Sequence, residues 1–302
     1  MKAVVLDAYG PPSNLQLKDV PAPTAGPGQV LIAVRAAGVN PIDWKMRSGQ
    51  MRDLFPVHFP AILGFDLAGV VLSCGSGVTG FAPADRVFGR ASAAYAEYVA
   101  GDVSGLARVP SGVDFTTAAA LPVISTTADQ LIRNAVQAQK GQTILLTGAL
   151  GSVGRLALFC ALELGARVVA GVRSSHIGQV LALGAHQALD LAREQDLTAL
   201  EPVDAVADCV GGELGPRLLP HIKPGGVYAS IVGPPRGAEA YPSVRIESFG
   251  SQPDPQAMLH YAAAIGQGRL QLPLGLVLPL AQAAEAHIQG ERGGAGKIVL
   301  TL

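Results

Sequence analysis

Three glycines spaced three residues apart are the clearest sign of chemistry in this sequence. Gly148, Gly151 and Gly154 follow the apolar run 143–147 and precede a second apolar run. Such a turn between a strand and a helix is typical of the dinucleotide fingerprint G-x-G-x-x-G, whose first glycine position is taken here by Ala149. The second glycine lets the backbone approach a pyrophosphate, and the third lets the helix pack closely. The turn therefore predicts a nucleotide site, with a tight turn that binds no ligand as the alternative.

The end of the second strand indicates which dinucleotide this would be. Residues 167–172 form an apolar run, and an NAD-binding unit carries Asp or Glu at its end for the ribose 2′-hydroxyl. Residues 171–175 contain no carboxylate, whereas Arg173 offers a bidentate guanidinium and Ser174 and Ser175 offer hydroxyls. We therefore expect NADPH; the alternative is that Arg173 is a solvated surface residue.

The elements that position this turn alternate regularly from residue 141 onward. Strands are expected at residues 143–147, 167–172, 204–210 and 226–232, and helices at residues 153–164 and 179–183. This alternation predicts parallel βαβ units with helices on both faces of a sheet. Val210, Val232 and Gly233 end or follow the later strands and should face the cofactor, with simple strand-ending turns as the alternative.

The rest of the chain is predicted to be mostly β-structure with a few helices. Short β-rich runs separated by Gly and Pro clusters fill the first 120 residues, at 3–6, 30–34, 69–72 and 86–88. A helical segment is expected at residues 116–138, around Pro122. The C-terminal part is expected to contain helices at 255–267 and 280–289 and strands at 274–278 and 297–302.

The composition narrows the class of protein. A length of 302 residues suggests about two domains, and 49% hydrophobic against 15% charged residues excludes a disordered chain. The formal net charge of -1 gives no sign of a basic nucleic-acid surface. The three cysteines are far apart, and no apolar run reaches the length of a membrane span. We expect a cytoplasmic protein that binds neither nucleic acid nor a membrane and acts on a small molecule.

Motifs along almost the whole chain resemble the medium-chain dehydrogenase/reductase superfamily, in its zinc-independent NADPH:quinone oxidoreductase branch. No single motif decides this resemblance, but their order and spacing are specific. The matching segments are residues 38–43, 47–49, 63–71, 85–89, 95–99, 118–122, 147–154 and 296–300.

The resemblance implies an α/β architecture of two domains, one of them discontinuous. Residues 1–122 and 256–302 would form a chaperonin-10-like, mostly β catalytic domain, and residues 123–255 a Rossmann domain with a doubly wound parallel sheet. The active site would lie in the cleft between the domains. The resemblance also implies NADPH-dependent reduction of a quinone or an α,β-unsaturated carbonyl by a homodimer. Its pattern at the domain junction adds Thr126 or Thr127 as a contact of the nicotinamide or a phosphate.

The residues that we expect to bind the cofactor include the two threonines that the resemblance implies. The full set is Thr126, Thr127, Gly148, Ala149, Gly151, Ser152, Val153, Arg173, Ser174, Ser175, Val210, Val232 and Gly233.

The sequence departs from the zinc enzymes of the superfamily at the metal positions. Those enzymes place Cys where Asn40 stands and a His-Glu pair where Phe65 and Asp66 stand. Catalytic zinc needs about three protein ligands, and the six histidines and three cysteines are isolated in the sequence. We therefore expect no metal. Some relatives also have a tyrosine soon after the Arg-Ser-Gly motif, where Gln50 and Met51 stand here, so no proton donor is identified.

Asn40 is the leading candidate for catalysis. Negative charge builds on the substrate oxygen as a hydride arrives, and an amide donor can stabilise this charge without ionising. The alternative is that Asn40 only caps the loop before Pro41. Asp43 and Asp66 are expected to be solvated loop carboxylates, with a polar network around the cleft as the alternative. Lys297 resembles a family residue of open role.

Two other functions stay open at this stage. One is an NADPH-dependent ketone or aldehyde reductase. The other is an NADPH-binding protein with a mainly structural or regulatory role, which the missing tyrosine favours slightly. Oxidation of NADPH with quinones, enals or ketones would distinguish the enzymes from the binding protein.

Overall fold

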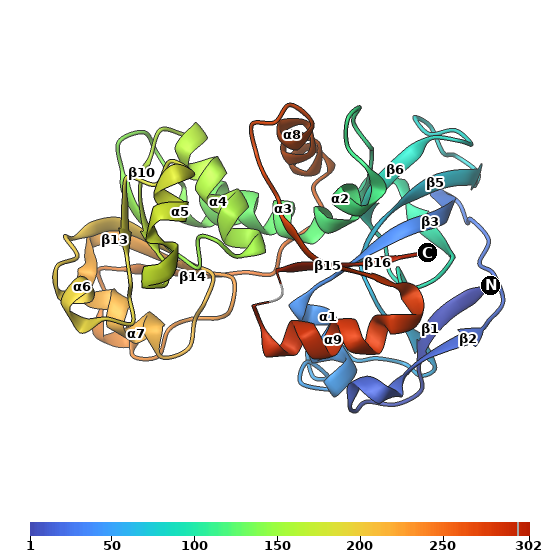
Figure 1. Ribbon diagram of the computed structural model, residues 1–302, viewed down its shortest axis with the longest axis horizontal. Coiled ribbons are helices and arrows are strands. Elements are labelled where there is room, and N and C mark those ends of the chain that lie inside the picture. The colour runs from blue at the N-terminus through green and yellow to red at the C-terminus, as the bar shows by residue number, and fades with distance from the viewer. Residues whose placement is uncertain (295) are drawn as a thin grey trace. The chain divides into compact units, whose positions relative to one another are not determined.

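The structure is a computed structural model that describes residues 1–294 and 296–302, and its chain divides into two compact units (Figure 1). Unit 1 consists of Met1–Val123 and Pro253–Leu302, and unit 2 consists of Ile124–Gln252. The chain therefore leaves the first unit, forms the second, and returns to the first.

Unit 2 is a doubly wound α/β fold around a parallel sheet. Its described strands pair in the order β11-β10-β9-β12-β13-β14, and every pair is parallel. The strands are β9 (Thr143–Thr147), β10 (Arg167–Gly171), β11 (Gln187–Leu189), β12 (Val203–Asp208), β13 (Ile222–Ser230) and β14 (Arg245–Ser248). The helices are α3 (Pro122–Gln130, which begins in unit 1), the π-helical segment η3 (Leu131–Val136), α4 (Ser152–Glu163), α5 (Ile177–Ala182), α6 (Glu194–Thr198) and α7 (Leu214–Leu218).

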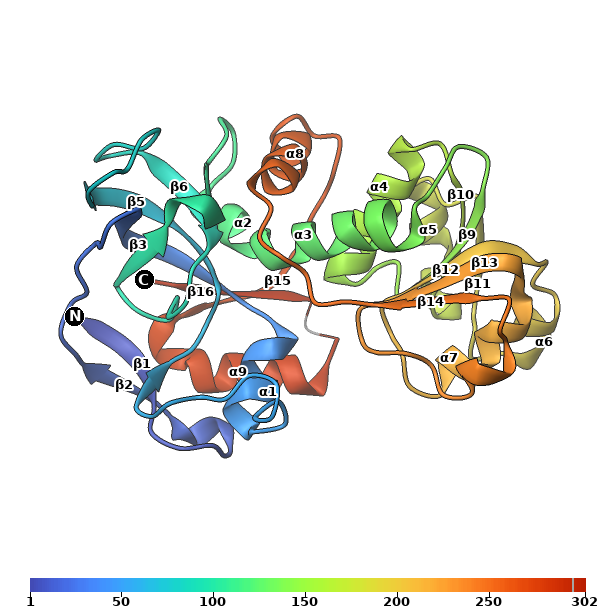
Figure 2. The ribbon, with the colours of Figure 1, turned by 180° about the vertical axis from the view of Figure 1, so that it is seen from behind.

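Burial on both faces explains why the central strands are continuously apolar. Ile144, Leu145 and Leu146 of β9 are all fully buried, as expected for a parallel strand that is covered on both sides. In Figures 1 and 2, α4 and α5 lie on one side of the strands of unit 2, and α6 and α7 lie on the other. The carboxyl ends of the strands consequently share one edge of the sheet, which carries the glycine turn.

Unit 1 is mostly β-structure with helices packed around it. Among the described residues, one sheet has the order β2-β1-β4, and a larger one has the order β15-β16-β3-β5-β6-β8, with β7 paired to β3. The strands are β1 (Lys2–Leu6), β2 (Leu15–Asp19), β3 (Gln29–Val39), β4 (Ala61–Ile62), β5 (Asp66–Cys74), β6 (Arg86–Arg90), β7 (Tyr98–Asp102), β8 (Leu106–Arg108), β15 (Leu274–Pro279) and β16 (Lys297–Thr301). The helices are α1 (Pro41–Ser48), α2 (Phe115–Ala120), α8 (Pro255–Gly266) and α9 (Ala283–Arg292).

Helix α1 follows the long strand β3 directly, and its sequence explains both of its ends. Asn40 is the N-cap, Pro41 takes the first helical position, and the carboxylate of Asp43 accepts the backbone N–H of Asn40 at 2.8 Å. The helix ends at Gly49, whose φ of 83° is the left-handed conformation that favours glycine. Asn40 is thereby held at the junction of a buried strand and a helix.

The expected fold class is confirmed, and most of the expected elements are found. Strand β9 has the predicted bounds, and β10, β12, β13, α4, α5 and α8 lie within a few residues of theirs. The expected helical segment around Pro122 is divided, since α2 ends at Ala120 and α3 begins at Pro122. Short or polar strands such as β2, β11 and β14 were not predicted. None of the helices in the described ranges is long and apolar enough to cross a lipid bilayer.

Candidate functional site

The glycine turn after β9 is closed on one side and open on the other. Gly148 has a left-handed φ of 62°, which favours glycine. A Cβ atom at Gly154 would lie 2.1 Å from the carbonyl oxygen of Gly148, so helix α4 packs against the turn only because this residue has no side chain. A Cβ atom at Gly151, by contrast, would meet no atom nearer than that oxygen at 3.2 Å. The backbone at Gly151 is therefore the open face of the turn.

This open face suits the pyrophosphate of a dinucleotide. Gly151 is the N-cap of α4, a helix of 12 residues, and the first N–H groups of a helix have no intrahelical acceptor. Those groups and the positive end of the helix dipole attract an anion. The side chain of Ala149 is fully buried, so Ala149 can offer a ligand only its backbone. The residues present fit the cofactor that the sequence predicted.

A buried carboxylate that the sequence analysis missed holds this edge of the sheet together. Asp208, the last residue of β12, is fully buried. Within the described residues it accepts five hydrogen bonds, at 2.7–3.1 Å, from the Thr147 and Ser230 hydroxyls, the Tyr228 phenol, and the backbone N–H groups of Val210 and Gly211. Asp208 thus ties the ends of β9, β12 and β13 to one another. The signal was available, because an Asp that ends a buried apolar run needs partners.

Two predicted residues, Val210 and Val232, present apolar surface beside the turn. Their side chains are 53% and 47% exposed. A Cβ atom at Gly148 would lie 3.0 Å from a methyl group of Val210, and one at Gly211 would lie 2.5 Å from a methyl group of Val232. The loops after β12 and β13 therefore meet next to the glycine turn. Exposed apolar side chains at this edge suit one face of a planar ring.

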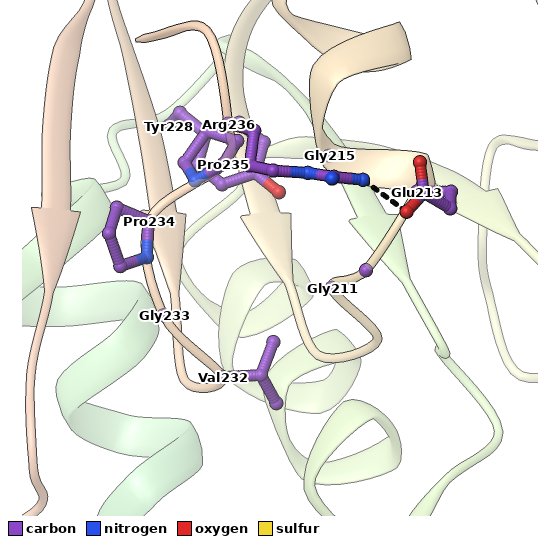
Figure 3. Close-up of a pocket in the computed structure, with 10 residues that line it drawn as sticks. Gly211, Glu213, Gly215, Tyr228, Val232, Gly233, Pro234, Pro235 and Arg236 are labelled. Carbon is purple, nitrogen blue, oxygen red and sulfur yellow. Dashed lines mark hydrogen bonds and ion pairs between the residues drawn. The ribbon is translucent and has the colours of Figure 1, made fainter.

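A pocket of about 260 Å³ continues from these loops (Figure 3). Gly211, Val232 and Gly233 line it, together with the fully buried Tyr228 and with Arg236. Figure 3 shows the Arg236 side chain extended toward Glu213, with which it forms an exposed ion pair. The structure thus brings the predicted Val232 and Gly233 into one concave surface.

The end of β10 differs from the expectation in one respect. Arg173, Ser174 and Ser175 are exposed there, as a site for the ribose end of the cofactor requires. Residues 171–175 contain no carboxylate, but Asp190 brings one to this position from the end of the neighbouring strand β11. Its carboxylate accepts the Ser174 hydroxyl at 2.5 Å and the Ser174 backbone N–H at 2.8 Å. Asp190 was not predicted here, because the expectation considered only the residues that follow β10.

The two predicted threonines lie on α3. Thr126 is fully buried and Thr127 is 9% exposed. The Thr127 hydroxyl donates to the Ser251 hydroxyl at 2.9 Å, which places this part of α3 beside the C-terminal end of unit 2.

Unit 1 contains a second cluster, in which a buried ammonium holds the candidate Asn40. Lys297, the first residue of β16, is 3% exposed, and its Nζ donates to Oδ1 of Asn40 at 2.7 Å. The Asn40 Nδ2 in turn donates to the Asp66 carboxylate at 2.8 Å, and Nζ lies 3.4 Å from the same oxygen. These contacts fix which end of the Asn40 amide is the donor. One N–H of Nδ2 donates to Asp66. The second N–H takes no part in that hydrogen bond.

Asp43 and Tyr95 extend this cluster toward α9. The Tyr95 hydroxyl donates to Asp43 at 2.9 Å and lies 3.4 Å from Nε2 of His287. Asp43 and Asp66 are fully buried, so the expectation of solvated loop carboxylates was wrong. Tyr95 is also fully buried. Asp43 lies on α1, which packs against α9, whereas Asp66 begins β5, which packs against α2. These tertiary contacts bury both carboxylates.

Burial dominates the protonation equilibria of the ion pair in this cluster. Desolvation lowers the pKa of the Lys297 ammonium, and the Asp66 carboxylate opposes that change. Desolvation raises the pKa of Asp66, and Lys297 and the Asn40 amide oppose it. The two charges therefore stabilise each other in a site from which water is excluded.

The neighbouring groups in the cluster are shifted toward their neutral forms. Burial raises the pKa of Asp43 to about 7, against the opposing effect of its hydrogen bonds from Asn40 and Tyr95. Burial and the Asp43 charge raise the pKa of Tyr95 well above its ordinary value. Burial, together with the Arg47 charge, lowers the pKa of His287 to about 3. His287 is thus neutral at pH 7, and Asp43 exchanges its proton near neutrality.

The described side chains form no metal site. Among them, no group of three or more His, Cys, Asp or Glu side chains is arranged to hold a metal ion. The positions that carry ligands in zinc relatives are occupied by Asn40, Phe65 and Asp66, two of which bind the Lys297 ammonium.

Comparisons with known proteins match both parts of the chain. Residues 26–114 match the family model of the alcohol dehydrogenase GroES-like domain, and residues 183–300 match the zinc-binding dehydrogenase model. The chain is 30% identical to the quinone oxidoreductase of Sus scrofa over 100% of this chain and 98% of that protein. It is 34% identical to the chloroplastic NADPH-dependent alkenal/one oxidoreductase of Arabidopsis thaliana, over 77% of this chain and 63% of that protein.

Among solved structures, the chain is similar to the quinone oxidoreductase from Coxiella burnetii. The two share 30% sequence identity with a TM-score of 0.90, over 100% of this chain and 99% of that one. The similarity therefore extends over both units and is not confined to the glycine turn.

Asp208→Asn tests whether one carboxylate holds the strand ends together. The amide keeps one acceptor oxygen and places an NH₂ group against donors, so we expect the free energy of unfolding to fall by about 2–4 kcal/mol. Urea denaturation measures this change. The matched control is Asp204→Asn on the same strand, whose half-buried carboxylate binds Thr143 and Lys223 and should cost under about 1 kcal/mol. Equal costs for the two variants would contradict the role of Asp208.

Asp43→Asn tests the raised pKa of the buried carboxyl. The folded protein retains a proton up to about pH 7 that the unfolded chain releases near its ordinary pKa of 3.8. Wild type should therefore lose stability, relative to Asp43→Asn, as the pH rises from about 4 to about 7. Urea denaturation at several pH values measures the difference in the free energy of unfolding. The contributions of the other titratable groups cancel in this difference, because both proteins share them. The control, exposed Asp53→Asn, should follow wild type; parallel curves for Asp43→Asn would refute the shift.

Proposed function

Because the chain belongs to the quinone oxidoreductase branch of the medium-chain dehydrogenase/reductase superfamily, we propose that it transfers a hydride from NADPH to a quinone or an α,β-unsaturated carbonyl compound. The observation that carries this proposal is the open glycine turn at Gly151, in a chain that aligns from end to end with a quinone oxidoreductase. The relative named as an NADPH-dependent alkenal/one oxidoreductase supports the same cofactor and the second class of substrate.

Unit 2 holds the cofactor in this proposal. The N–H groups of Ser152 and Val153 at the start of α4 bind the pyrophosphate, and Gly151, whose own N–H donates to the Gly148 carbonyl at 2.8 Å, lets the backbone approach it. Val210 and Val232 contact the nicotinamide half with their exposed side chains. The expected contacts at Thr126, Thr127, Gly148, Ala149 and Gly233 belong to the same proposal.

Arg173 is the reason to propose NADPH rather than NADH. Its guanidinium is exposed and makes no hydrogen bond or ion pair among the residues that the structure describes. A free guanidinium pairs in a bidentate manner with a phosphate, and Arg173 lies at the end of the second strand, where the ribose 2′ position is recognised.

Asn40 stabilises the charge that develops on the substrate oxygen. The nicotinamide supplies the hydride, and the protein supplies position and electrostatics. The amide of Asn40 is held by Lys297 on one end and Asp66 on the other, so its remaining N–H has a fixed direction and needs no reorganisation when the charge appears. The Lys297 ammonium adds positive charge behind the amide, which strengthens its donation.

The proposal includes a cytoplasmic homodimer, as the resemblance implies. Light scattering after size-exclusion chromatography would test the assembly, with a mass of twice the 30.9 kDa chain as the expected result.

The direct test is oxidation of NADPH, followed by absorbance, with a panel of quinones, enals, enones and ketones. We expect oxidation with quinones or enones. Tight binding of NADPH without oxidation by any acceptor would contradict the enzymatic proposal and favour a binding protein. Oxidation with ketones alone would favour the carbonyl reductase.

Asn40→Ala tests the proposed oxyanion donor. Loss of one preorganised donor lowers turnover by about a hundredfold, while the affinity for NADPH should change by less than about twofold because the amide acts on the substrate. Steady-state kinetics and calorimetry measure the two quantities. Asn14→Ala is the control, since the Asn14 side chain donates to the backbone carbonyls of Ala8 and Tyr9, and this variant should keep the wild-type turnover. Wild-type turnover in Asn40→Ala would remove Asn40 from the mechanism.

Arg173→Ala tests the recognition of the 2′-phosphate. The affinity for NADPH should fall about tenfold, as expected for one lost charge-assisted contact, and the affinity for NADH should change little. Calorimetric titration with both coenzymes measures this. Arg167→Ala, at the opposite end of β10, removes the same exposed charge from the same strand and should affect neither coenzyme. An unchanged NADPH affinity in Arg173→Ala would show that Arg173 is a solvated surface residue.

A further inference from the structure

Asp190 places a carboxylate beside the end of β10, where the ribose of the proposed cofactor would be recognised. Strands β10 and β11 are parallel neighbours, with Gly171 opposite Leu189, so the residues that follow them lie side by side. The Asp190 carboxylate accepts both the hydroxyl and the backbone N–H of Ser174 through the same oxygen, at 2.5 and 2.8 Å. Its other oxygen accepts the backbone N–H of Ala192 at 3.2 Å. The carboxylate is therefore held in place next to Arg173.

These contacts change what Ser174 can do. A serine hydroxyl has one proton to donate, and Ser174 donates it to Asp190. The hydroxyl therefore cannot donate to a phosphate while that contact lasts. Both Ser174 and Asp190 still have acceptor lone pairs, which suit a hydroxyl donor such as the ribose 2′-hydroxyl of NADH.

Residues of opposite charge, Arg173 and Asp190, follow the neighbouring strands β10 and β11. The hydrogen bonds from Ser174 lower the pKa of Asp190, and the nearby Arg193 charge contributes in the same direction, so the carboxylate is ionised at neutral pH. A ribose 2′-phosphate carries about −1.5 to −2 charges. Asp190 repels that phosphate, and Arg173 attracts it.

We propose that Asp190 is a specificity-determining residue, whose carboxylate limits the preference for NADPH by repelling the 2′-phosphate and by accepting the 2′-hydroxyl of NADH. The inference rests on the proposed function, since it assumes that the glycine turn binds a dinucleotide. It goes beyond that function in stating that both coenzymes are used and that Asp190 and Arg173 act in opposite directions.

The test compares wild type with Asp190→Asn and Asp190→Ser. Calorimetry with adenosine 2′,5′-bisphosphate and with adenosine 5′-monophosphate measures recognition of the 2′-phosphate without any reaction. Kinetics then give the ratio of kcat/KM for NADPH to that for NADH. We expect both variants to bind the bisphosphate about tenfold more tightly, the effect of one removed charge at short range. The monophosphate should bind more weakly than to wild type, because its 2′-hydroxyl loses the Asp190 acceptor. The kcat/KM ratio should rise by about the same factor.

Asp204→Asn is the control for net charge. It makes the same chemical change at the amino end of the sheet, where Asp204 binds Thr143, and it should alter neither affinity by more than about twofold. Two variants are compared so that a local folding defect in one of them does not decide the result. Asp190→Asn keeps an acceptor oxygen for the Ser174 N–H, and Asp190→Ser introduces a smaller side chain. Melting temperatures close to that of wild type check both.

Different failures have different meanings. An unchanged bisphosphate affinity in folded Asp190→Asn and Asp190→Ser overturns this inference and leaves the proposed function standing. An equal gain in Asp204→Asn also overturns it, because the effect would then belong to net charge. If wild type binds neither nucleotide, both the proposed function and the inference fall.

Discussion

A buried positive charge that has to be compensated governs the arrangement of unit 1. An unpaired ion in the interior costs several kcal/mol, and Lys297 is almost completely buried. Its partners are the Val39 carbonyl and the Asn40 amide at the end of β3, and Asp66 at the start of β5. Three segments far apart in the sequence must therefore meet for this ammonium to be satisfied. The pairing that stabilises the fold also fixes the orientation of the Asn40 amide, so folding and preorganisation of the site have one cause.

In unit 2, the buried carboxylate of Asp208 is compensated by hydrogen bonds. Asp208 is as deeply buried as Asp66, but its described partners are hydroxyl and N–H donors and include no cation. Several hydrogen-bond donors can compensate the burial of a carboxylate where no cation is near. Because the donors come from the ends of three neighbouring strands, the carboxylate aligns those ends with one another. This alignment matters because the glycine turn and the apolar Val210 and Val232 all lie at the same edge.

The fold was predictable because its signals are local, whereas much of the site depends on packing between distant segments. The apolar run of β9 and the glycines after it identify a strand, a turn and a helix without any knowledge of the rest. Strand β11 has only three residues and no alternation to reveal it. The polar cluster of unit 1 was misjudged for another reason. Asp43 and Asp66 have loop-like sequence surroundings, and they become buried through the packing of α1 against α9, of α2 against β5, and of Lys297 beside Asp66.

The prediction of coenzyme preference from the residues after a single strand is limited in the same way, because a residue from another strand lies at the same position. The rule that a carboxylate after the second strand selects NAD treats that strand as the source of every side chain near the ribose. In a parallel sheet, however, the end of the next strand lies within hydrogen-bond distance of the same position, as Asp190 and Ser174 demonstrate. In the proposed site, the ribose would meet a guanidinium from one strand end and a carboxylate from the other. Because these charges oppose each other, we propose that coenzyme preference depends on their balance and not on the presence of a single residue.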